Sequence, residues 1–309
     1  MSNIIANAYE RSGQSATKLL FPEDHTHTSP EGAARNAAYI VSGLKNTALK
    51  DMLSAAGLAA PNYHPGPKLP TPRYPMPLPL NATLPTIFLI GDSTVRNGRA
   101  DGANGQWGWG EPLADLIDAT QFNLVNRALG GLSSRTYLTL GHWDRVLAML
   151  KPGDLVLIQF GHNDGGAFDD KQRARASLKG VGEETRQIDN PITGHAETVH
   201  SYGWYLRRFI AESKQKGATP IVLSLVPRKV WKDGKIARNK SDYAGWAEAV
   251  AAATSTAFID LNETVAQQYE ALGPEAVEKL FGDERTHANR AGAELNAQAV
   301  LSALRHLNH

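Results

Sequence analysis

The decisive stretch of this chain reads Ile87-Phe88-Leu89-Ile90-Gly91-Asp92-Ser93-Thr94: four apolar residues, then a glycine, an acid and two hydroxyl residues. A short apolar run that ends at a glycine is typical of a strand buried in a parallel sheet. The serine after it lies where the strand ends, at the edge where such sheets carry their sites. Serine is also a common helix N-cap, so the segment alone leaves two roles for Ser93.

Apolar runs of the same kind recur along the chain and predict a five-stranded sheet. The expected strands are Thr86–Ile90, Phe122–Val125, Leu155–Phe160, Pro220–Val226 and Ala257–Leu261. Helical patterns separate or follow them, over Glu111–Ala119, Ser134–Leu150, Val199–Lys216, Asp242–Ala253, Glu263–Leu272 and Arg290–His306. Strands rich in Val, Ile and Leu that alternate with helices predict an α/β fold, a three-layer α/β/α sandwich around a parallel sheet.

Composition excludes several classes of protein. The chain has 309 residues, 42% of them hydrophobic and 20% charged, which is typical of globular domains. A formal charge of +1 gives no reason to expect a nucleic acid or membrane partner. The chain has no cysteine, which excludes disulfides, thiolate nucleophiles and cysteine-based metal sites. No uninterrupted apolar stretch reaches about 18 residues, so the sequence predicts no transmembrane helix.

A proline-rich segment divides the chain. Residues 61–85 contain nine prolines, and proline fixes φ and removes an amide donor. This composition predicts an extended linker rather than a helix or a central strand. We therefore expect an N-terminal segment over residues 1–60, a linker over 61–85 and a main domain over 86–309.

The N-terminal segment repeats the end of the chain. Met1–Lys45 aligns without a gap onto Leu261–Arg305, at a constant offset of 260 residues. The clearest part has 10 identities in 26 positions, including Leu20-Phe21, Thr26-His27 and Gly32-Ala33 against Leu280-Phe281, Thr286-His287 and Gly292-Ala293. The segment therefore resembles the tail of a second copy of the main domain.

Three segments that follow predicted strands carry residues suited to acyl transfer. A serine nucleophile such as Ser93 needs a base to take its proton. The pair Gly130-Gly131 leaves backbone amides able to donate to an oxyanion, and Asn163 adds a side-chain donor. His162, inside the same turn as Asn163, is interpreted as structural. Each segment also has a plainer interpretation, as a helix cap or a turn.

A fourth segment, just before the last predicted helix, supplies a base. His287 follows the acids Asp283 and Glu284, and a nearby carboxylate can hold an imidazole in one tautomer. Acids at this position also favour a helix dipole without any catalytic role. Because the four segments occur in this order at strand ends and a helix start, the catalytic interpretation is favoured.

Together these segments resemble the SGNH (GDSL-type) hydrolases, a family named for Ser, Gly, Asn and His in four sequence blocks. Here these residues are Ser93, Gly131, Asn163 and His287, and the resemblance covers about Leu84–His309. It implies a flavodoxin-like fold, Ser93 as nucleophile and His287 as base. It also implies an oxyanion hole formed by the amides of Ser93 and Gly131 with the Asn163 side chain, and a reaction without metal or organic cofactor.

The identity of the acid is less direct. The family pattern Asp-x-x-His predicts an acid three residues before the histidine, where this chain has Glu284. We expect Glu284 to orient His287, with Asp283 as the alternative. The N-terminal repeat keeps the family spacing in Asp24 and His27, which makes these two an alternative acid and base.

Three interpretations of the repeat remain open. It is a structural appendage left from a lost copy, which is favoured, or it replaces the C-terminal block in the site. In the third interpretation it completes a site on a neighbouring molecule, which would make a homo-oligomer through the N-terminal segment.

Within the family, the chain most resembles rhamnogalacturonan acetylesterases and related carbohydrate acetylesterases. The residues that carry this are Gly91-Asp92-Ser93-Thr94, Gly108-Trp109-Gly110, Asn126-Arg127-Ala128, Ser134-Arg135-Thr136-Tyr137 and Gly161-His162-Asn163-Asp164. The resemblance implies a serine esterase that removes acetyl groups from plant polysaccharide, of pectic rhamnogalacturonan or xylan type. Such enzymes are often secreted or periplasmic, whereas Met1–Thr17 lacks the pattern of a secretory signal, so no compartment is assigned.

Substrate contacts and competing functions follow from fewer residues. Trp109 and Trp231 are candidate stacking faces for sugar rings, and Arg228 can pair with a uronate carboxylate. Gly165–Thr193, rich in charge and glycine, is expected to be a mobile loop beside Asn163. The alternatives are a short-chain esterase, lipase or thioesterase of the same superfamily, and a carbohydrate-binding module without catalysis.

Overall fold

The computed structural model describes residues 5, 8, 9, 12, 16, 17, 19–21, 27–62 and 80–307. The chain forms two compact units, Met1–Leu78 and Pro79–His309, called here the N-terminal and C-terminal units. Between residues 27 and 62 the N-terminal unit contains helix α2 (Pro30–Leu44), a 3₁₀ turn (Lys50–Met52) and helix α3 (Ala55–Ala59). Asp24 lies outside the described residues, and so does most of the proline-rich segment.

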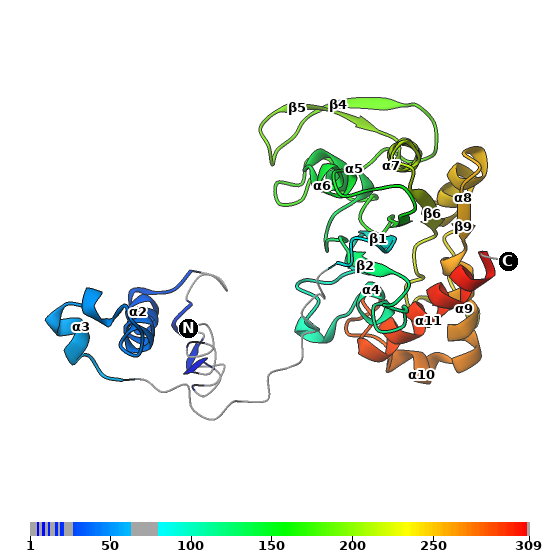
Figure 1. Ribbon diagram of the computed structural model, residues 1–309. Coiled ribbons are helices and arrows are strands. Elements are labelled where there is room, and N and C mark those ends of the chain that lie inside the picture. The colour runs from blue at the N-terminus through cyan, green and yellow to red at the C-terminus, as the bar shows by residue number, and fades with distance from the viewer. Residues whose placement is uncertain are drawn as a thin grey trace. The chain divides into compact units, whose positions relative to one another are not determined.

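The C-terminal unit is built on one parallel sheet of five strands (Figure 1). Its strands are β1 (Thr86–Gly91), β2 (Asn123–Asn126), β3 (Leu155–Gln159), β6 (Thr219–Leu223) and β9 (Ala257–Ile259). Their order in the sheet is β2-β1-β3-β6-β9, and every neighbouring pair is parallel. The predicted α/β fold is confirmed, and each of these five strands lies at one of the predicted apolar runs.

Helices cover both faces of the sheet. One face packs against α4 (Gly110–Leu113), α9 (Leu261–Leu272), α10 (Pro274–Glu278) and α11 (Arg290–Leu307). The other face packs against α5 (Ser134–Thr139), α6 (His142–Leu147), α7 (Tyr202–Gln215) and α8 (Tyr243–Ala253). Side chains alternate along β1, so Ile87 and Leu89 enter the first core while Phe88 and Ile90 enter the second. The three-layer prediction therefore follows from a strand that is apolar on both faces.

Two predicted helices are shorter than expected. The helix expected over Glu111–Ala119 is α4, which ends at Leu113. The helix expected over Ser134–Leu150 is broken into α5 and α6 at Gly141, whose φ of 74° is left-handed. Because a left-handed residue cannot continue an α-helix, the chain turns there and starts a new helix.

The segment expected as a loop, Gly165–Thr193, contains strand structure. Strand β4 (Thr185–Asp189) pairs antiparallel with β5 (Ala196–His200), and a second small hairpin joins β7 (Trp231–Lys232) to β8 (Lys235–Ile236). The loop prediction is wrong for β4, because its polar and mostly exposed residues give no apolar strand signal.

A buried ion pair links the β4–β5 hairpin to helix α5. The Arg135 side chain is fully buried at the start of α5 and donates from Nε and Nη2 to the two Glu197 oxygens, at 2.8 and 2.6 Å. Its Nη1 also donates to the Ala176 carbonyl at 2.7 Å. Such two-point pairing fixes orientation as well as charge, so β5 and the preceding chain hold a set position over α5.

Among the residues that the structure describes, no helix is long and apolar enough to span a bilayer. The carboxyl ends of β2, β1 and β3 meet at one edge of the sheet, where a binding or catalytic site is expected in such folds.

Candidate active site

Three of the predicted site residues lie where neighbouring strands end. Ser93 follows β1, Gly131 follows β2 and Asn163 follows β3, and β1 lies between the other two strands. Parallel strands bring their carboxyl ends to one edge, so residues 32 to 70 positions apart meet there. His287 reaches the same place from the loop before α11.

The turn that presents Ser93 is built by its neighbours. A side chain on Gly91 would lie 2.5 Å from the Gln159 carbonyl of β3, so only glycine fits. Asp92 is fully buried, and its Oδ1 accepts from the amide and the hydroxyl of Thr94, at 2.9 and 2.8 Å. This side-chain turn bends the chain sharply after the strand and presents the largely buried Ser93 hydroxyl to His287.

A buried network continues from this turn and includes Trp109. Gln159 donates to the Thr94 hydroxyl at 2.7 Å and accepts from the Trp109 indole N–H at 2.8 Å. Trp109 is only 1% exposed, within the apolar core. The prediction that Trp109 stacks on a sugar is therefore wrong, because its ring faces are covered by the protein. Trp231, the other candidate, lies half-buried in β7 and packs at the edge of the same core.

Ser93 is hydrogen-bonded to His287. Its Oγ lies 2.8 Å from His287 Nε2, and His287 Nδ1 lies 2.5 Å from Asp283 Oδ2. The hydroxyl, the imidazole and the carboxylate thus form one continuous chain. The other candidate histidine, His27, belongs to the N-terminal unit and is exposed.

The carboxylate hydrogen-bonded to His287 is that of Asp283, the alternative candidate, and not that of Glu284. Asp283 Oδ1 accepts from the backbone amides of Arg285, Thr286 and His287, at 3.0, 2.7 and 2.9 Å. These bonds curl the loop, so the carboxylate four residues before the histidine reaches its ring. Glu284 points out of this turn and is exposed.

The same bonds set the charge of Asp283. Partial burial by itself raises the pKa of this carboxyl, but the bonds from His287 and from the Thr286 and Arg285 amides outweigh it and lower the pKa to about 2. The carboxylate is therefore charged at neutral pH, as a group that stabilises an imidazolium must be.

Backbone and side-chain donors surround Ser93. A side chain on Gly130 would lie 3.4 Å from Ser93 Cβ, so the glycine loop runs beside the serine. Gly131 has a left-handed φ of 84°, and no atom crowds its side-chain position. Asn163 donates to the Leu132 carbonyl at 2.8 Å, which fixes its amide group and leaves a second N–H on the same nitrogen.

A cavity of about 240 Å³ lies beside Asn163. Its lining includes two cations, one acid and two uncharged polar side chains: Arg175 and Arg228, Asp242, and His162 and Tyr243. Several buried polar atoms there have no partner among the described residues: both His162 ring nitrogens, Arg228 Nε, Asp242 Oδ1 and the Tyr243 hydroxyl. The cavity therefore offers unsatisfied donors and acceptors to a polar ligand. The sequence pointed only to Arg228, because the other cation, Arg175, lies far from any motif.

His162 is a poor candidate for a base. Burial lowers its pKa to about 4, so the ring is neutral at neutral pH.

Arg175 links the cavity to the glycine loop, because its Nη1 donates to the Gly131 carbonyl at 3.2 Å. Desolvation lowers the pKa of Arg228.

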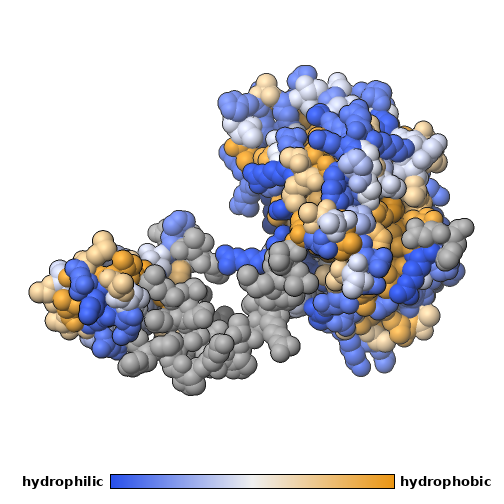
Figure 2. Space-filling model, viewed as in Figure 1, coloured by the Kyte–Doolittle hydropathy of each residue, from blue (hydrophilic) through white to orange (hydrophobic). Residues whose placement is uncertain are grey.

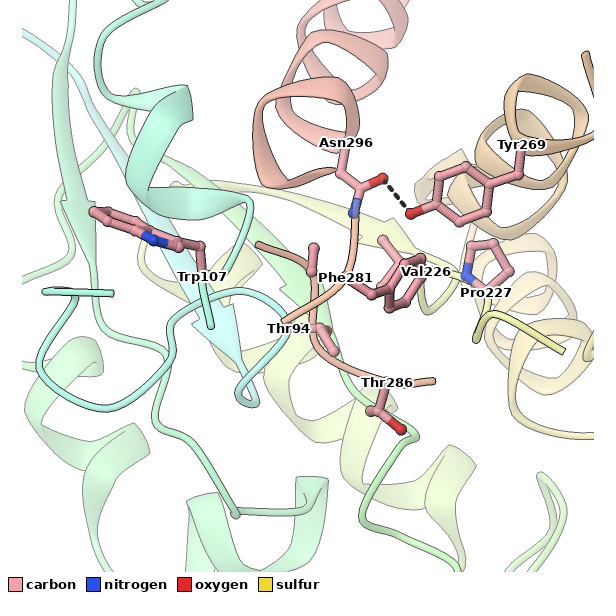
Figure 3. A pocket seen from close by; sticks show the side chains of 9 residues that line it. Thr94, Trp107, Val226, Pro227, Tyr269, Phe281, Thr286 and Asn296 are labelled. Carbon is pink, nitrogen blue, oxygen red and sulfur yellow. Dashed lines mark hydrogen bonds between the residues drawn. The ribbon is translucent and has the colours of Figure 1, made fainter. Parts of the chain in front are cut away.

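Beneath the histidine loop lies a second, very small cavity of about 10 Å³ (Figure 3). It is bounded by Thr286 from the loop and by Tyr269 and Asn296 from α9 and α11, whose side chains are hydrogen-bonded at 3.4 Å. Such a space holds about one water molecule. Within residues 27–62 and 80–307 and the few described before them, no group of three His, Asp or Glu side chains is arranged to hold a metal ion.

Two sequence relatives each match 72% of this chain. Rhamnogalacturonan acetylesterase from Emericella nidulans is 32% identical over 224 residues, which are 72% of this chain and 86% of the relative. The probable rhamnogalacturonan acetylesterase YesY from Bacillus subtilis is 28% identical over 226 residues, which are 72% of this chain and 93% of the relative.

A solved structure shows the same fold. The crystal structure of Bacillus subtilis YxiM superimposes with a TM-score of 0.58 at 27% identity, over 73% of this chain and 57% of that longer chain. The family model for GDSL-like lipases and acylhydrolases matches residues 89–295, a span that holds Ser93, Gly131, Asn163 and His287. With two thirds of its length inside that match, the chain is an esterase of the GDSL-like lipase/acylhydrolase (SGNH) family.

Proposed function

We propose that this esterase removes acetyl groups from acetylated plant polysaccharides or their oligosaccharides, through an acyl-enzyme on Ser93. The observation that carries the proposal is the bonded chain from Ser93 through His287 to Asp283, at 2.8 and 2.5 Å. The Gly130-Gly131 loop runs beside Ser93, and a donor role of Gly131 and Asn163 toward a developing oxyanion is part of the proposal.

The chemistry proceeds in two halves. Ser93 Oγ attacks the acetyl carbon while its proton passes to His287 Nε2, and the carbonyl oxygen becomes an oxyanion that accepts from Ser93 and Gly131 amides and Asn163. The imidazolium then gives its proton to the departing sugar oxygen, which leaves acetyl-Ser93 and a free sugar hydroxyl. His287 next takes a proton from water, whose oxygen attacks the acetyl group, and Ser93 regains its proton as acetate leaves.

The experiment that tests this proposal measures acetate release and active-site labelling. The protein is expected to release acetate from acetylated pectic or xylan oligosaccharides, and a fluorophosphonate probe is expected to label Ser93. Nitrophenyl acetate should be cleaved faster than nitrophenyl decanoate, because the cavity beside Asn163 is lined by charged and polar groups. A preference for the long acyl chain would favour a lipase or thioesterase, and an unlabelled Ser93 would favour a binding module.

Asn163→Ala is expected to lower kcat by about 10²–10³ with little change in KM. The reason is that its amide is proposed to meet charge that exists only in the transition state. The same amide also bonds the Leu132 carbonyl, so the urea midpoint of the variant is measured beside its kinetics. A raised KM with unchanged kcat would show that Asn163 binds substrate rather than the oxyanion.

The cavity supports a charged substrate within this class. Arg175 and Arg228 both line it, and both have their pKa lowered because the surrounding protein removes water from the guanidinium. A substrate carboxylate bound in the cavity would form charge-assisted hydrogen bonds with these guanidinium groups and replace the water that they have lost. We therefore favour a pectic substrate, whose uronate residues carry carboxylates, over the neutral xylan type; two of the relatives are named as rhamnogalacturonan acetylesterases.

Arg228→Gln is expected to raise KM for an acetylated uronate-containing oligosaccharide about tenfold, the loss of one charge-assisted hydrogen bond. Hydrolysis of nitrophenyl acetate, which has no carboxylate, is expected to be unchanged. Arg145→Gln is the matched control, because Arg145 is exposed on α6 and does not line the cavity. An equal loss on both substrates would place Arg228 in support of the fold instead.

A further inference from the structure

The described residues of the N-terminal unit repeat several contacts of the C-terminal block that carries His287, Leu261–Arg305. In that block Tyr269 of α9 donates to Asn296 of α11 at 3.4 Å (Figure 3). In the N-terminal unit Tyr9 donates to Asn36 of α2 at 2.5 Å, and both residues lie 260 positions earlier. Each tyrosine ring also meets a phenylalanine edge-on, at centroid distances of 5.6 and 5.8 Å in the pairs Tyr9–Phe21 and Tyr269–Phe281.

The starts of the two helices match in the same way. Ser29 Oγ accepts from the Gly32 amide at 3.1 Å, and Asn289 Oδ1 accepts from the Gly292 amide at 3.1 Å. The two cap residues differ, but the caps occupy equivalent positions. Identical geometry from different side chains indicates a shared backbone, because chance identities in sequence would not reproduce the bond.

The close approach of each helix to the preceding chain is also repeated. The Ser29 amide donates to the Leu20 carbonyl at 2.8 Å, and the Asn289 amide donates to the Leu280 carbonyl at 2.9 Å. A side chain at the first glycine of either helix would lie under 3 Å from that same leucine carbonyl. Two independent stretches of this chain therefore fold into the same helix-entry motif.

Equivalent faces of α11 and α2 differ in their exposure to solvent. On α11 three core residues are 0% exposed against the C-terminal unit: Ala293, Ala297 and Val300. Their counterparts on α2 are all exposed: Ala33, Ala37 and Ile40, the last at 41%. The N-terminal unit also exposes further large apolar side chains: Leu19, Leu49, Met52 and Leu58. Hydrophobic patches lie on the face of this unit that Figure 2 shows. The described part of the N-terminal unit thus repeats the apolar positions Ala33, Ala37 and Ile40, called here the α2 stripe, and leaves them exposed.

We propose that the N-terminal unit docks on the C-terminal unit of a second copy of this chain, in the place that α11 occupies there. The α2 stripe of Ala33, Ala37 and Ile40 would then cover the sheet and α4 as α11 does, and His27 would take the position of His287. Exchange of equivalent elements between copies costs little, because contacts of the same kind are lost and gained.

The linker composition favours docking of the N-terminal unit on a second molecule over docking on the C-terminal unit of the same chain. Nine prolines between residues 61 and 85 are a composition that makes a chain stiff and extended. An extended linker whose length does not match the distance to the α11 position of its own chain would give the N-terminal unit a low effective concentration there. Intermolecular docking then competes successfully as protein concentration rises.

The association is tested first without reference to activity. Light scattering of the full chain is expected to show a dimer that grows with protein concentration. Ala37→Glu is expected to abolish the dimer, because it places a charge on the stripe. Ala34→Glu is the matched control: its counterpart on α11 is Glu294, which is exposed, so the dimer should persist. A monomer at every concentration, or a dimer insensitive to Ala37→Glu, overturns the proposal.

The second test asks whether His27 enters a partner's site, and it rests on the proposed function. A full-length Ser93→Ala variant is mixed with a full-length variant that carries both His27→Ala and His287→Ala. Neither has activity alone, and their mixture is expected to regain acetate release that rises with concentration. Adding His27→Ala to the Ser93→Ala variant distinguishes exchange of the N-terminal block, which carries His27, from exchange of the C-terminal block, which carries His287. If activity then persists, the C-terminal block is exchanged instead, which contradicts the proposal, as does a mixture with no activity. Ala37→Glu and Ala34→Glu in the Ser93→Ala partner should again abolish and preserve the gain.

Discussion

At dilute protein, where exchange between copies is suppressed, replacement of His287 by alanine is expected to lower kcat by about 10⁶, the size of effect seen when a base and nucleophile act as a unit. The reason is the 2.8 Å bond from His287 Nε2 to Ser93 Oγ, which makes this imidazole the acceptor of the serine proton. Steady-state kinetics of nitrophenyl acetate hydrolysis measures the loss of kcat. KM is expected to change little, because the imidazole contacts the reacting oxygen rather than the sugar.

His27→Ala is the control for this variant. His27 aligns with His287 in the repeat but lies in the N-terminal unit, so the substitution is expected to leave most of the activity at dilute protein. Low concentration matters, because any exchange between copies is then suppressed. If His27→Ala removed the activity while His287→Ala preserved it, the assignment of the base would be reversed.

The sequence predicted the sheet well because its strands are apolar on both faces. Ile87 to Ile90 bury alternately into two cores, so the whole run is apolar and no period-2 pattern is needed to recognise it. Ser93, Gly131 and Asn163 could be placed together for the same reason, since a parallel sheet brings strand ends to one edge. The polar hairpin β4–β5 gave no such signal, and it is held by tertiary contacts such as the Arg135–Glu197 pair.

Side-chain packing explains one site prediction that is wrong, Trp109, and one cavity residue that was not predicted, Arg175. Trp109 belongs to the Gly108-Trp109-Gly110 motif, which suggested a position at the site. Its indole N–H instead donates to the buried Gln159 side chain, and the ring lies in the core. Arg175 was missed because nothing in its neighbourhood resembles a motif, and only the folded chain brings it to the Gly131 carbonyl. Long side chains and irregular loops are set by three-dimensional neighbours, which local sequence does not reveal.

The acid shows how one turn changes a spacing rule. A fixed spacing of three residues assumes a regular loop, which pointed to Glu284. In the structure Asp283 accepts from three consecutive amides, those of Arg285, Thr286 and His287, and this curls the loop so that the fourth residue back meets the ring. Aspartate suits such a turn because its short side chain bonds its own backbone, which the longer glutamate does less well.

Asp283→Asn is therefore expected to lower kcat by about 10⁴, whereas Glu284→Gln is expected to leave it unchanged. An amide at position 283 cannot stabilise the imidazolium and favours the wrong tautomer of His287, although the backbone turn can persist through its carbonyl oxygen. Glu284 is exposed and makes the matched control. Comparable losses in the two variants, or a loss confined to Glu284→Gln, would show that the 2.5 Å bond is not the functional one.

The pH dependence of stability supplies a second readout for the same variant. The pKa of Asp283 is lowered to about 2, below its ordinary 3.8, so its bonds stabilise the folded state above the ordinary value. That contribution is lost as pH falls from about 4 through about 2, where the carboxylate takes up a proton. The difference in unfolding free energy between Asp283→Asn and the parent chain is thus expected to be present at pH 7 and to shrink towards pH 2. Urea titrations at both pH values measure it, and a difference independent of pH would mean that the charge of Asp283 does not hold the histidine loop.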